Sequence, residues 1–238
     1  MRQTDGTWRI LDVVVEGVSL ALTHRAEYTA VIEIDLAEHG RCGRVGRIDD
    51  DQALFGIVQG GIDEQLRAES AQRTVELEFD GYGIGGLSVG ETRGEMVPAL
   101  AVALTHLPLD RPRYLMGVGD PASLVEAVAL GVDQFDCVMQ TRIGRHGTAL
   151  TGEGKLHIKN AKHTVSDEPL DSACSCDVCQ RHSRGYIRHL FQVGEPTASR
   201  LVSLHNISWT LQLMAGMRAA IEAGTFGAYR QQVLAVWG

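Results

Sequence analysis

Aromatic residues make up only 5% of this 238-residue sequence, and no stretch of it stays apolar for long. The longest apolar runs, such as Val97–Leu104, fall far short of the ~20 residues that a membrane-spanning helix needs. The N-terminus lacks the basic, apolar and small-residue regions of a secretory signal. Hydrophobic residues still reach 44%, which excludes a disordered chain and suffices for one large domain or two modest ones. We therefore expect a soluble, cytoplasmic protein without a membrane segment.

Positive charge is also scarce. The 22 Lys and Arg residues stand against 30 Asp and Glu, and the net charge of −8 argues against a general nucleic-acid coat protein. The charges are unevenly distributed, because residues 1–140 carry 11 basic and 23 acidic side chains whereas residues 141–238 carry 11 and 7. The C-terminal part can thus present a polyanion-binding face on an acidic protein. An uneven surface without a function is the alternative.

Short apolar runs that end in polar or glycine-rich turns recur through the middle of the chain. Their starts are 20–32 residues apart with helical patterns between them, the order typical of βα units on a parallel sheet. The predicted strands are Phe55–Val58, Tyr82–Leu87, Tyr114–Val118 and Gln134–Met139. The predicted helices are Asp63–Phe79, Thr92–Leu107 and one that Asp120 caps with Pro121 at its first position.

The pattern changes after Met139 and is different again before Ala53. Alternating polar and apolar residues over Trp8–Asp35 are typical of antiparallel strands. Beyond Met139, we predict a hairpin of Thr148–Thr151 with Lys155–Ile158, a cysteine-rich loop, and the helices Ser183–Gln192 and Trp209–Ala223. The chain thus divides into a divergent β-like N-terminal segment, a set of βα units, a hairpin and cysteine-bearing subdomain, and a C-terminal helix, at residues 1–52, 53–147, 148–210 and 211–238.

The sharpest chemical signal is the cysteine spacing. Cys174, Cys176 and Cys179 form a Cys-x-Cys-x-x-Cys cluster, and His205 follows farther along the chain. Three thiolates and one imidazole make a closed tetrahedral site that suits structural Zn²⁺ and leaves no position for a substrate. Reduced cysteines with an unrelated histidine are the alternative, while a disulfide is disfavoured because Cys174 and Cys176 are too close to pair comfortably. We predict one structural zinc per chain.

Polar side chains or bare backbone follow each predicted strand. Ligands of α/β sheets and barrels bind at the carboxyl ends of the strands, so four such positions on successive strands would converge on one face. Each position taken alone also has a structural explanation, as a turn residue or a loop cap. The positions are Gln59 with two glycines, the segment Gly85–Glu91, the segment Met116–Gly119, and Asp136 among apolar neighbours.

Basic residues gather after the strand that carries Asp136. The segment Thr141–Gly147 contains two arginines, and three lysines follow it. Arg181, Arg184 and Arg188 are spaced i, i+3 and i+7, which places them on one helix face next to the cysteine loop. Contact with RNA phosphates is one interpretation, and a solvated helix face is the other.

These segments, in this order, resemble the queuine tRNA-ribosyltransferases, also called tRNA-guanine transglycosylases. The resemblance extends from Ala53 to Tyr229 and rests on FGIVQGG, FDGYGIGGLSVGE, RPRYLMGVG, FDCV, NAKH, PLD with the cysteine cluster, and LHN. It implies a TIM barrel with an inserted zinc-bearing subdomain that grips tRNA. It also implies exchange of the wobble guanine of a GUN anticodon for a 7-deazaguanine in queuosine biosynthesis, through a covalent carboxylate–ribose intermediate with retention.

The resemblance also implies roles for individual residues. Asp136 stands at the nucleophile position, and Val89 matches the bacterial type, which takes the smaller base preQ1. The residues that match base contacts are Gln59, Gly86, Leu87 and Met116. Those that match tRNA contacts are Gly117, Val118, Gly119, Asp120, Pro121, Ala122, Ser123, Thr141, Arg142, Ile143, Gly144 and Arg145. Those that match the zinc ligands are Cys174, Cys176, Cys179 and His205.

The sequence also departs from the family pattern. Residues 1–52 offer no match to the family's N-terminal half, which supplies a general-base aspartate and a second aspartate for base recognition. Gln140 replaces the usual proline, which we expect to loosen the presentation of Asp136, and His146 replaces an asparagine. We expect impaired activity and a chain that is unstable alone, forms a homodimer, or needs a complementing N-terminal half. A non-catalytic tRNA-binding subunit and an inactive remnant are the alternatives.

Overall fold

The computed structural model describes residues 2–4, 7–9, 53–88 and 90–238. Two short strands, β1 (Arg2–Thr4) and β2 (Thr7–Arg9), pair antiparallel, and the rest of the predicted strand region lies outside the described residues. The chain forms two compact units, the first comprising Met1–Val118 with Ala127–Asp136 and the second Gly119–Glu126 with Cys137–Gly238. In the described ranges, no helix is both long and apolar enough to cross a membrane.

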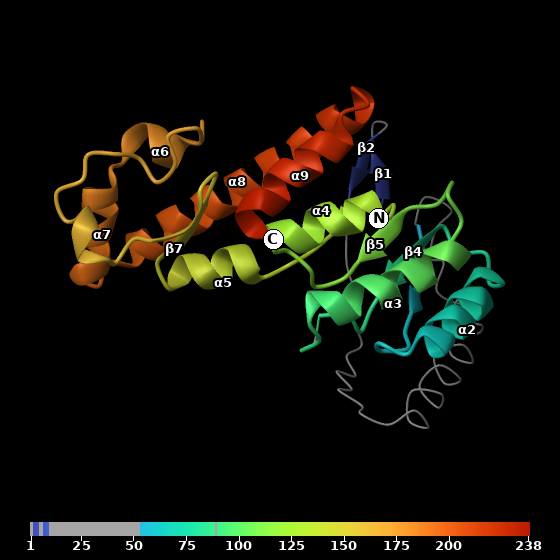
Figure 1. The fold of residues 1–238 in the computed structure, drawn as a ribbon. Coiled ribbons are helices and arrows are strands. Elements are labelled where there is room, and N and C mark those ends of the chain that lie inside the picture. Colours follow the sequence, from blue (N-terminus) through green and yellow to red (C-terminus); the bar gives the residue numbers. More distant parts are fainter. Residues whose placement is uncertain (1, 5–6, 10–52, 89) are drawn as a thin grey trace. The chain divides into compact units, whose positions relative to one another are not determined.

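A four-stranded parallel sheet organises the first unit (Figure 1). Its strands are neighbours in the order in which they occur along the chain, so each βα unit adds one strand beside the last. The sheet core includes fully buried Val58, Ile84 and Leu115, one from each of three adjacent strands. This confirms the predicted α/β class with a parallel sheet. The strands are β3 (Phe55–Val58), β4 (Gly81–Ile84), β5 (Arg113–Leu115) and β6 (Gln134–Phe135).

Helices alternate with these strands and begin where the sequence predicts. The Asp63 carboxylate accepts hydrogen bonds from two backbone N–H groups of the next turn, and Glu95 accepts one at 2.8 Å from the Thr92 N–H. Asp120 caps the third helix by accepting from the Ser123 N–H at 3.0 Å. The helices are α2 (Glu64–Val75), α3 (Arg93–His106) and α4 (Pro121–Ala129).

Three predicted strands of the sheet end earlier than expected. Strand β4 ends at Ile84 rather than Leu87, and β5 ends at Leu115 rather than Val118. We predict a strand over Gln134–Met139, but β6 ends at Phe135, and helix α5 (Met139–Arg145) takes up the end of that run. Buried Gln140 and Gly144, spaced four apart, face α8 (Pro196–Glu222), so helical packing overrides the apolar pattern. A Cβ on Gly144 would lie only 2.8 Å from the Ser203 Oγ, and the glycine therefore permits this close approach.

The second unit joins a hairpin to a cluster of helices (Figure 1). The strands β7 (Thr148–Thr151) and β8 (Gly154–His157) pair antiparallel as predicted. A short 3-10 helix η1 (Ala161–His163) follows them, and then α6 (Asp177–Arg181), α7 (Arg184–Gln192), α8 and α9 (Phe226–Trp237). A second core fills the space between these elements; it consists of Ala149, Ile158, Leu170, Val178, Ile187 and Val202.

Three predictions for this unit are wrong. Helix α8 begins 13 residues before the predicted Trp209, with Pro196 in its first turn, and the C-terminal region 211–238 holds the end of α8 and all of α9 rather than one helix. The arginines at 181, 184 and 188 do not share one helix either, because His182 is extended (φ −132°, ψ 132°) and separates α6 from α7.

Candidate functional site

Asp136 lies at the carboxyl end of β6, in contact with the end of β5. Its Oδ1 accepts a hydrogen bond from the Tyr114 phenol at 2.5 Å and another from the Gly117 N–H at 2.9 Å. Although its neighbours in sequence are apolar, the Asp136 side chain is exposed at the sheet edge. Burial, followed by the hydrogen bond to Asp136, raises the pKa of Tyr114 far above its usual value. The phenol therefore remains a donor, and two donors fix one oxygen of the carboxylate.

The turns after β3 and β4 also meet at this edge. A Cβ on Gly85 would lie 2.8 Å from the Gln59 Nε2, and one on Gly86 would lie 2.8 Å from the Gln59 Oε1. The Gln59 side chain thus packs directly on bare backbone, and a Cβ at either glycine would require the end of that side chain to move. Gly86 also has φ +66°, which favours glycine on conformational grounds.

The other two predicted base-contact residues lie beside these turns. The Met116 Sδ is 3.5 Å from the position that a Cβ on Gly83 would take, and the Leu87 side chain is fully buried. The sheet therefore brings Gln59, Gly86 and Met116 to the ends of three adjacent strands, as predicted.

The predicted RNA-contacting segments fall in both units. Gly117 and Val118 belong to the first, whereas Gly119–Ser123 and Thr141–Arg145 belong to the second. Within the second unit, the Gln140 Nε2 donates to the Gly119 carbonyl at 3.0 Å and joins its two segments. Arg142 and Arg145 are exposed on α5, while Gly144 is buried.

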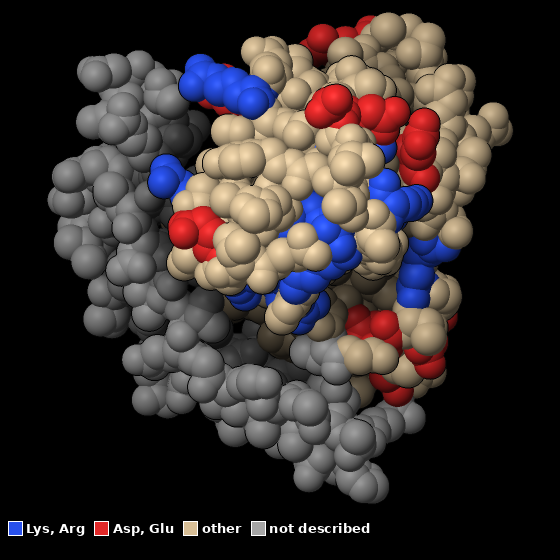
Figure 2. All heavy atoms as spheres, turned by 90° about the vertical axis from the view of Figure 1, so that its left-hand side faces the viewer, with Lys and Arg blue, Asp and Glu red and all other residues tan. Residues whose placement is uncertain are grey.

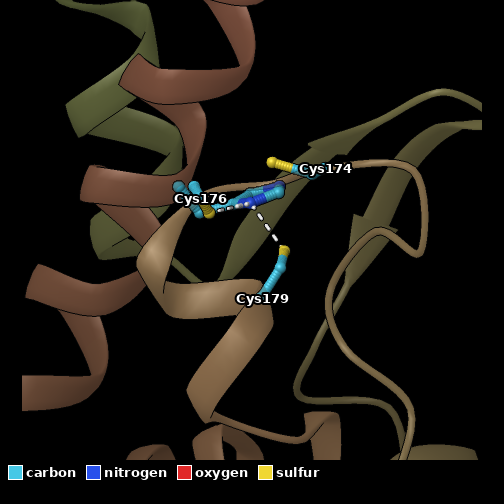
Figure 3. Close-up of side chains that lie close together, drawn as sticks. Cys174, Cys176 and Cys179 are labelled. Atoms are coloured by element: carbon cyan, nitrogen blue, oxygen red, sulfur yellow. Dashed lines mark hydrogen bonds between the residues drawn. The ribbon is translucent and has the colours of Figure 1, made fainter.

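The four predicted metal ligands come together in the second unit. The three thiol sulfurs and the imidazole nitrogen of Cys174, Cys176, Cys179 and His205 all lie within 4.8 Å of one another, with the thiols gathered around one ring (Figure 3). A tetrahedron with bonds of about 2.0–2.3 Å to Zn²⁺ has edges of roughly 3.5–4 Å, so the spacing fits a Cys₃His site.

Hydrogen bonds orient the His205 ring for this role. Its Nε2 lies 2.8 Å from the Leu150 carbonyl, which selects the tautomer with a proton on Nε2. The Nδ1 then faces the sulfurs of Cys176 and Cys179 at 3.5 and 3.2 Å as an acceptor. Burial lowers the pKa of His205, which favours the neutral ring that binds metals.

Comparisons of the sequence identify the chain's relatives. The family model for queuine tRNA-ribosyltransferase matches residues 19–238. The chain belongs to this family. Its matched region extends earlier than the motif resemblance, which begins at Ala53. A second model, for the MlaC protein, matches residues 1–36 only.

Curated members of the queuine tRNA-ribosyltransferase family are about half identical to this chain over the region that aligns with it. The proteins so named from Symbiobacterium thermophilum and Sphingopyxis alaskensis are 50% and 53% identical to it over 197 and 183 residues, 83% and 77% of this chain. One from a Thermoanaerobacter species is 46% identical over 207 residues, 87% of this chain. These matches cover 49%, 49% and 55% of the relatives, so the chain spans about half the length of the curated relatives it matches.

The basic side chains of this family member differ in accessibility. Figure 2 views the molecule from the side of α6 and α7 and shows Lys and Arg gathered near the middle of that face, with acidic side chains mostly toward its margins. Arg184 pairs with Glu168 at 2.5 Å and also donates to the Leu170 carbonyl, and Arg188 donates to the Asn160 carbonyl at 3.0 Å. These two arginines therefore hold loops of the second unit together, which the helical spacing did not predict.

Sequence reasoning missed three residues that organise the site. The sequence indicates only that Tyr114 lies in a strand and that Arg67 is one charged residue of an amphipathic helix. It shows Asn206 only as part of a short motif. The fully buried Asn206 amide bonds three backbone groups: its Oδ1 accepts from the Leu150 N–H, and its Nδ2 donates to the Gln140 and Thr148 carbonyls. A polar residue directly after a predicted metal ligand is a signal that could have singled out Asn206.

Proposed function

We propose that this chain carries the nucleophile, part of the base pocket and the RNA-gripping subdomain of a bacterial-type tRNA-guanine transglycosylase. It would exchange the wobble guanine of a GUN anticodon for preQ1, a 7-deazaguanine, in queuosine biosynthesis. The observation that carries this proposal is Asp136, a carboxylate held by Tyr114 and Gly117 at the strand ends of a family member. Gln59 and Gly86 at the ends of neighbouring strands add the means to contact a base.

The proposed reaction consists of two displacements at the ribose C1′. An Asp136 oxygen bonds to C1′ while the bond from C1′ to guanine N9 breaks, and guanine keeps the electron pair and takes up a proton. The incoming base then bonds to C1′, loses a proton and expels the carboxylate. Two inversions give net retention, as in retaining glycosidases. Tyr114 and Gly117 stabilise the carboxylate when it leaves, since both donors suit the ionised form.

The second unit would bind the tRNA. Exposed Arg142 and Arg145 on α5 are placed for phosphate contact, and Gly119–Ser123 lies in the same unit. Zn²⁺ at the Cys₃His cluster would supply structure rather than chemistry, because its four protein ligands complete the tetrahedron. His205 would hold the ion from α8, the helix that packs on α5. A tRNA-modifying activity of this kind belongs in the cytoplasm.

We further propose that the sheet forms part of a TIM barrel. Four parallel strands in chain order, with helices between them, support this assignment. Among the described residues, no strand pairs with the outer edges of β3 and β6, and such edges favour association. A complementing N-terminal half, or a second copy of the chain, is therefore the proposed partner, and the former would bring the general-base aspartate.

Exchange of labelled guanine into unmodified tRNA tests the proposed function. The purified chain is compared with Asp136→Asn, which keeps the size of the side chain but removes the nucleophilic charge. Asp133→Asn is the matched control, because Asp133 lies at the opposite end of β6 from Asp136. Exchange that is abolished only by Asp136→Asn supports an enzyme. If tRNA binds and zinc is present but no exchange occurs even with an added N-terminal half, the catalytic role is wrong and a binding subunit remains.

A further inference from the structure

Arg67 is a basic residue with no exposed surface. It lies in helix α2 and its relative exposure is 0%. A buried guanidinium is costly unless its N–H groups find acceptors, so the position demands a specific set of partners. The hydrogen-bond acceptors of the guanidinium therefore indicate the role of Arg67.

The acceptors are backbone carbonyls of two strand-end turns. The Arg67 Nε donates to the Gly61 carbonyl at 2.7 Å and Nη1 to the Val58 carbonyl at 3.3 Å, both around the turn after β3. Nη2 donates to the Gly86 carbonyl at 3.1 Å, in the turn after β4. The rigid planar fork of arginine can reach these three carbonyls together, whereas the compact ammonium of lysine cannot.

Gln59 lies in the chain between Val58 and Gly61, two of the residues whose carbonyls accept hydrogen bonds from Arg67. Its side chain rests against Gly85 and Gly86, and the Arg67 Nη2 is 3.5 Å from the position that a Cβ on Gly86 would take. The backbone N–H of Gln59 donates to the Ser70 Oγ at 3.0 Å, one turn along α2 from Arg67. Two buried side chains of α2 thus hold the turn that carries Gln59.

The bond to Gly86 also fixes the orientation of a peptide. In a trans peptide the C=O and the following N–H point in opposite directions. Because the Gly86 carbonyl points to Arg67, the Leu87 N–H points away from it. Arg67 therefore selects one of the two orientations in which this turn can offer its polar groups to a ligand.

We propose that Arg67 is a positioning residue for base recognition, which sets the distance between the Gln59 amide and the Gly86–Leu87 peptide. This inference rests on the proposed function, because the ligand is the purine base that the two turns would contact. Arg67 does not touch the base itself. Its effect is to keep the two turns in one arrangement before the base arrives, which lowers the ordering cost of binding.

Equilibrium dialysis of radiolabelled guanine against the zinc-loaded chain tests this proposal with Arg67→Lys. The matched control is Arg73→Lys on the same helix, whose arginine is exposed and pairs with Glu69. We expect the guanine Kd to rise at least tenfold in Arg67→Lys and to stay within twofold in Arg73→Lys, with unchanged tRNA affinity in both. Hydrogen exchange should accelerate in peptides that contain residues 59–61 and 85–87 and stay unchanged in α3.

The outcomes separate this proposal from the proposed function. A folded Arg67→Lys protein with unchanged guanine affinity and unchanged amide hydrogen exchange would overturn the proposal. A lower melting temperature as the sole effect would overturn it too. If the unsubstituted chain binds no guanine, the proposed base site is wrong. Hydrogen exchange in Arg67→Lys and in the unsubstituted chain still decides whether Arg67 holds the two turns. If Arg67→Lys does not fold, Ser70→Ala removes only the acceptor of the Gln59 N–H and should weaken guanine binding about fivefold.

Discussion

The Tyr114 phenol and the Gly117 N–H meet at a single oxygen of Asp136, at 2.5 and 2.9 Å. The two donors come from β5 and the turn after it, whereas the carboxylate follows β6. Pairing of adjacent parallel strands thus produces a carboxylate with one oxygen fixed and the other available to bond to carbon. Neither strand alone contains this arrangement.

Replacement of Tyr114 tests the value of the phenol. We expect Tyr114→Phe to slow the breakdown of the covalent Asp136–RNA adduct by the incoming base roughly 10- to 100-fold, because the departing carboxylate loses a hydrogen bond to a charged group, which contributes about 1.5–3 kcal/mol. The adduct is measured over time on denaturing gels, in the presence of the complementing half if the chain requires it. Tyr229→Phe is the control, since that phenol donates to the Leu213 carbonyl in the second unit. Equal rates for both variants would contradict the role of Tyr114.

The metal content of the purified chain follows from the cysteine cluster. We expect about one zinc per chain by elemental analysis, and loss of zinc together with the cooperative unfolding of the second unit in Cys176→Ser. Cys137→Ser is the control, because Cys137 lies outside the cluster and this variant should keep its zinc. Chelator-free protein without metal would show that the cluster holds reduced cysteines.

Asn206 should be important for stability rather than for chemistry. Asn206→Ala leaves the buried Leu150 N–H and two carbonyls without their partner, and each unsatisfied group costs about 1–3 kcal/mol. We expect the free energy of unfolding to fall by about 2–5 kcal/mol, measured by urea titration of zinc-loaded protein. Asn160→Ala is the control, since Asn160 is exposed. A loss below about 0.5 kcal/mol would mean that water replaces the amide.

The basic face can be tested through the salt dependence of tRNA binding. We expect Arg142→Gln and Arg145→Gln each to weaken binding and to reduce the slope of log K against log salt by about one, since each exposed guanidinium would release one counterion. Arg218→Gln is the control, because the Arg218 side chain is exposed on α8 and lies outside the proposed contact segments. Unchanged slopes would remove α5 from the interface. Arg184→Gln should instead lower stability, because it breaks the pair with Glu168.

His163 should make stability depend on pH. Its ring is buried, its Nε2 has no hydrogen-bond partner in the described part of the chain, and burial together with the nearby Lys162 and Arg184 charges lowers its pKa. As the pH falls below about 6.5, the unfolded chain therefore takes up a proton that the folded chain resists, and the free energy of unfolding decreases until the folded pKa is passed.

The contribution of His163 is the pH-dependent difference in the free energy of unfolding between the unsubstituted chain and a variant without this histidine. We expect His163→Phe to gain stability relative to the unsubstituted chain between pH 7 and pH 5, measured by urea titration with saturating zinc. A difference that stays constant over this range would show that His163 ionises equally in both states.

The sequence predicted local features better than long-range ones. Strand β3, the cap Asp63, the hairpin and the four clustered ligands follow from patterns within a few residues or from a set of ligand types that suits a metal ion. The helix α5 and the true start of α8 were missed because each depends on packing against the other. Arg67 was missed for the same reason: its acceptors are up to 19 residues away, and only the folded turns bring them together.

The contact of Gln59 with Gly85 and Gly86 restricts how the proposed pocket could be redesigned. A methyl group at either glycine would lie 2.8 Å from the Gln59 amide, so the end of the Gln59 side chain would have to move. A shorter residue at position 59 would relieve this contact. We expect a mutant library that varies Gln59 and Gly85 jointly to yield more functional clones than one that varies Gly85 alone, because a shorter side chain at position 59 makes room for a Cβ at position 85. Changes in base preference at this edge would then arise as coupled substitutions.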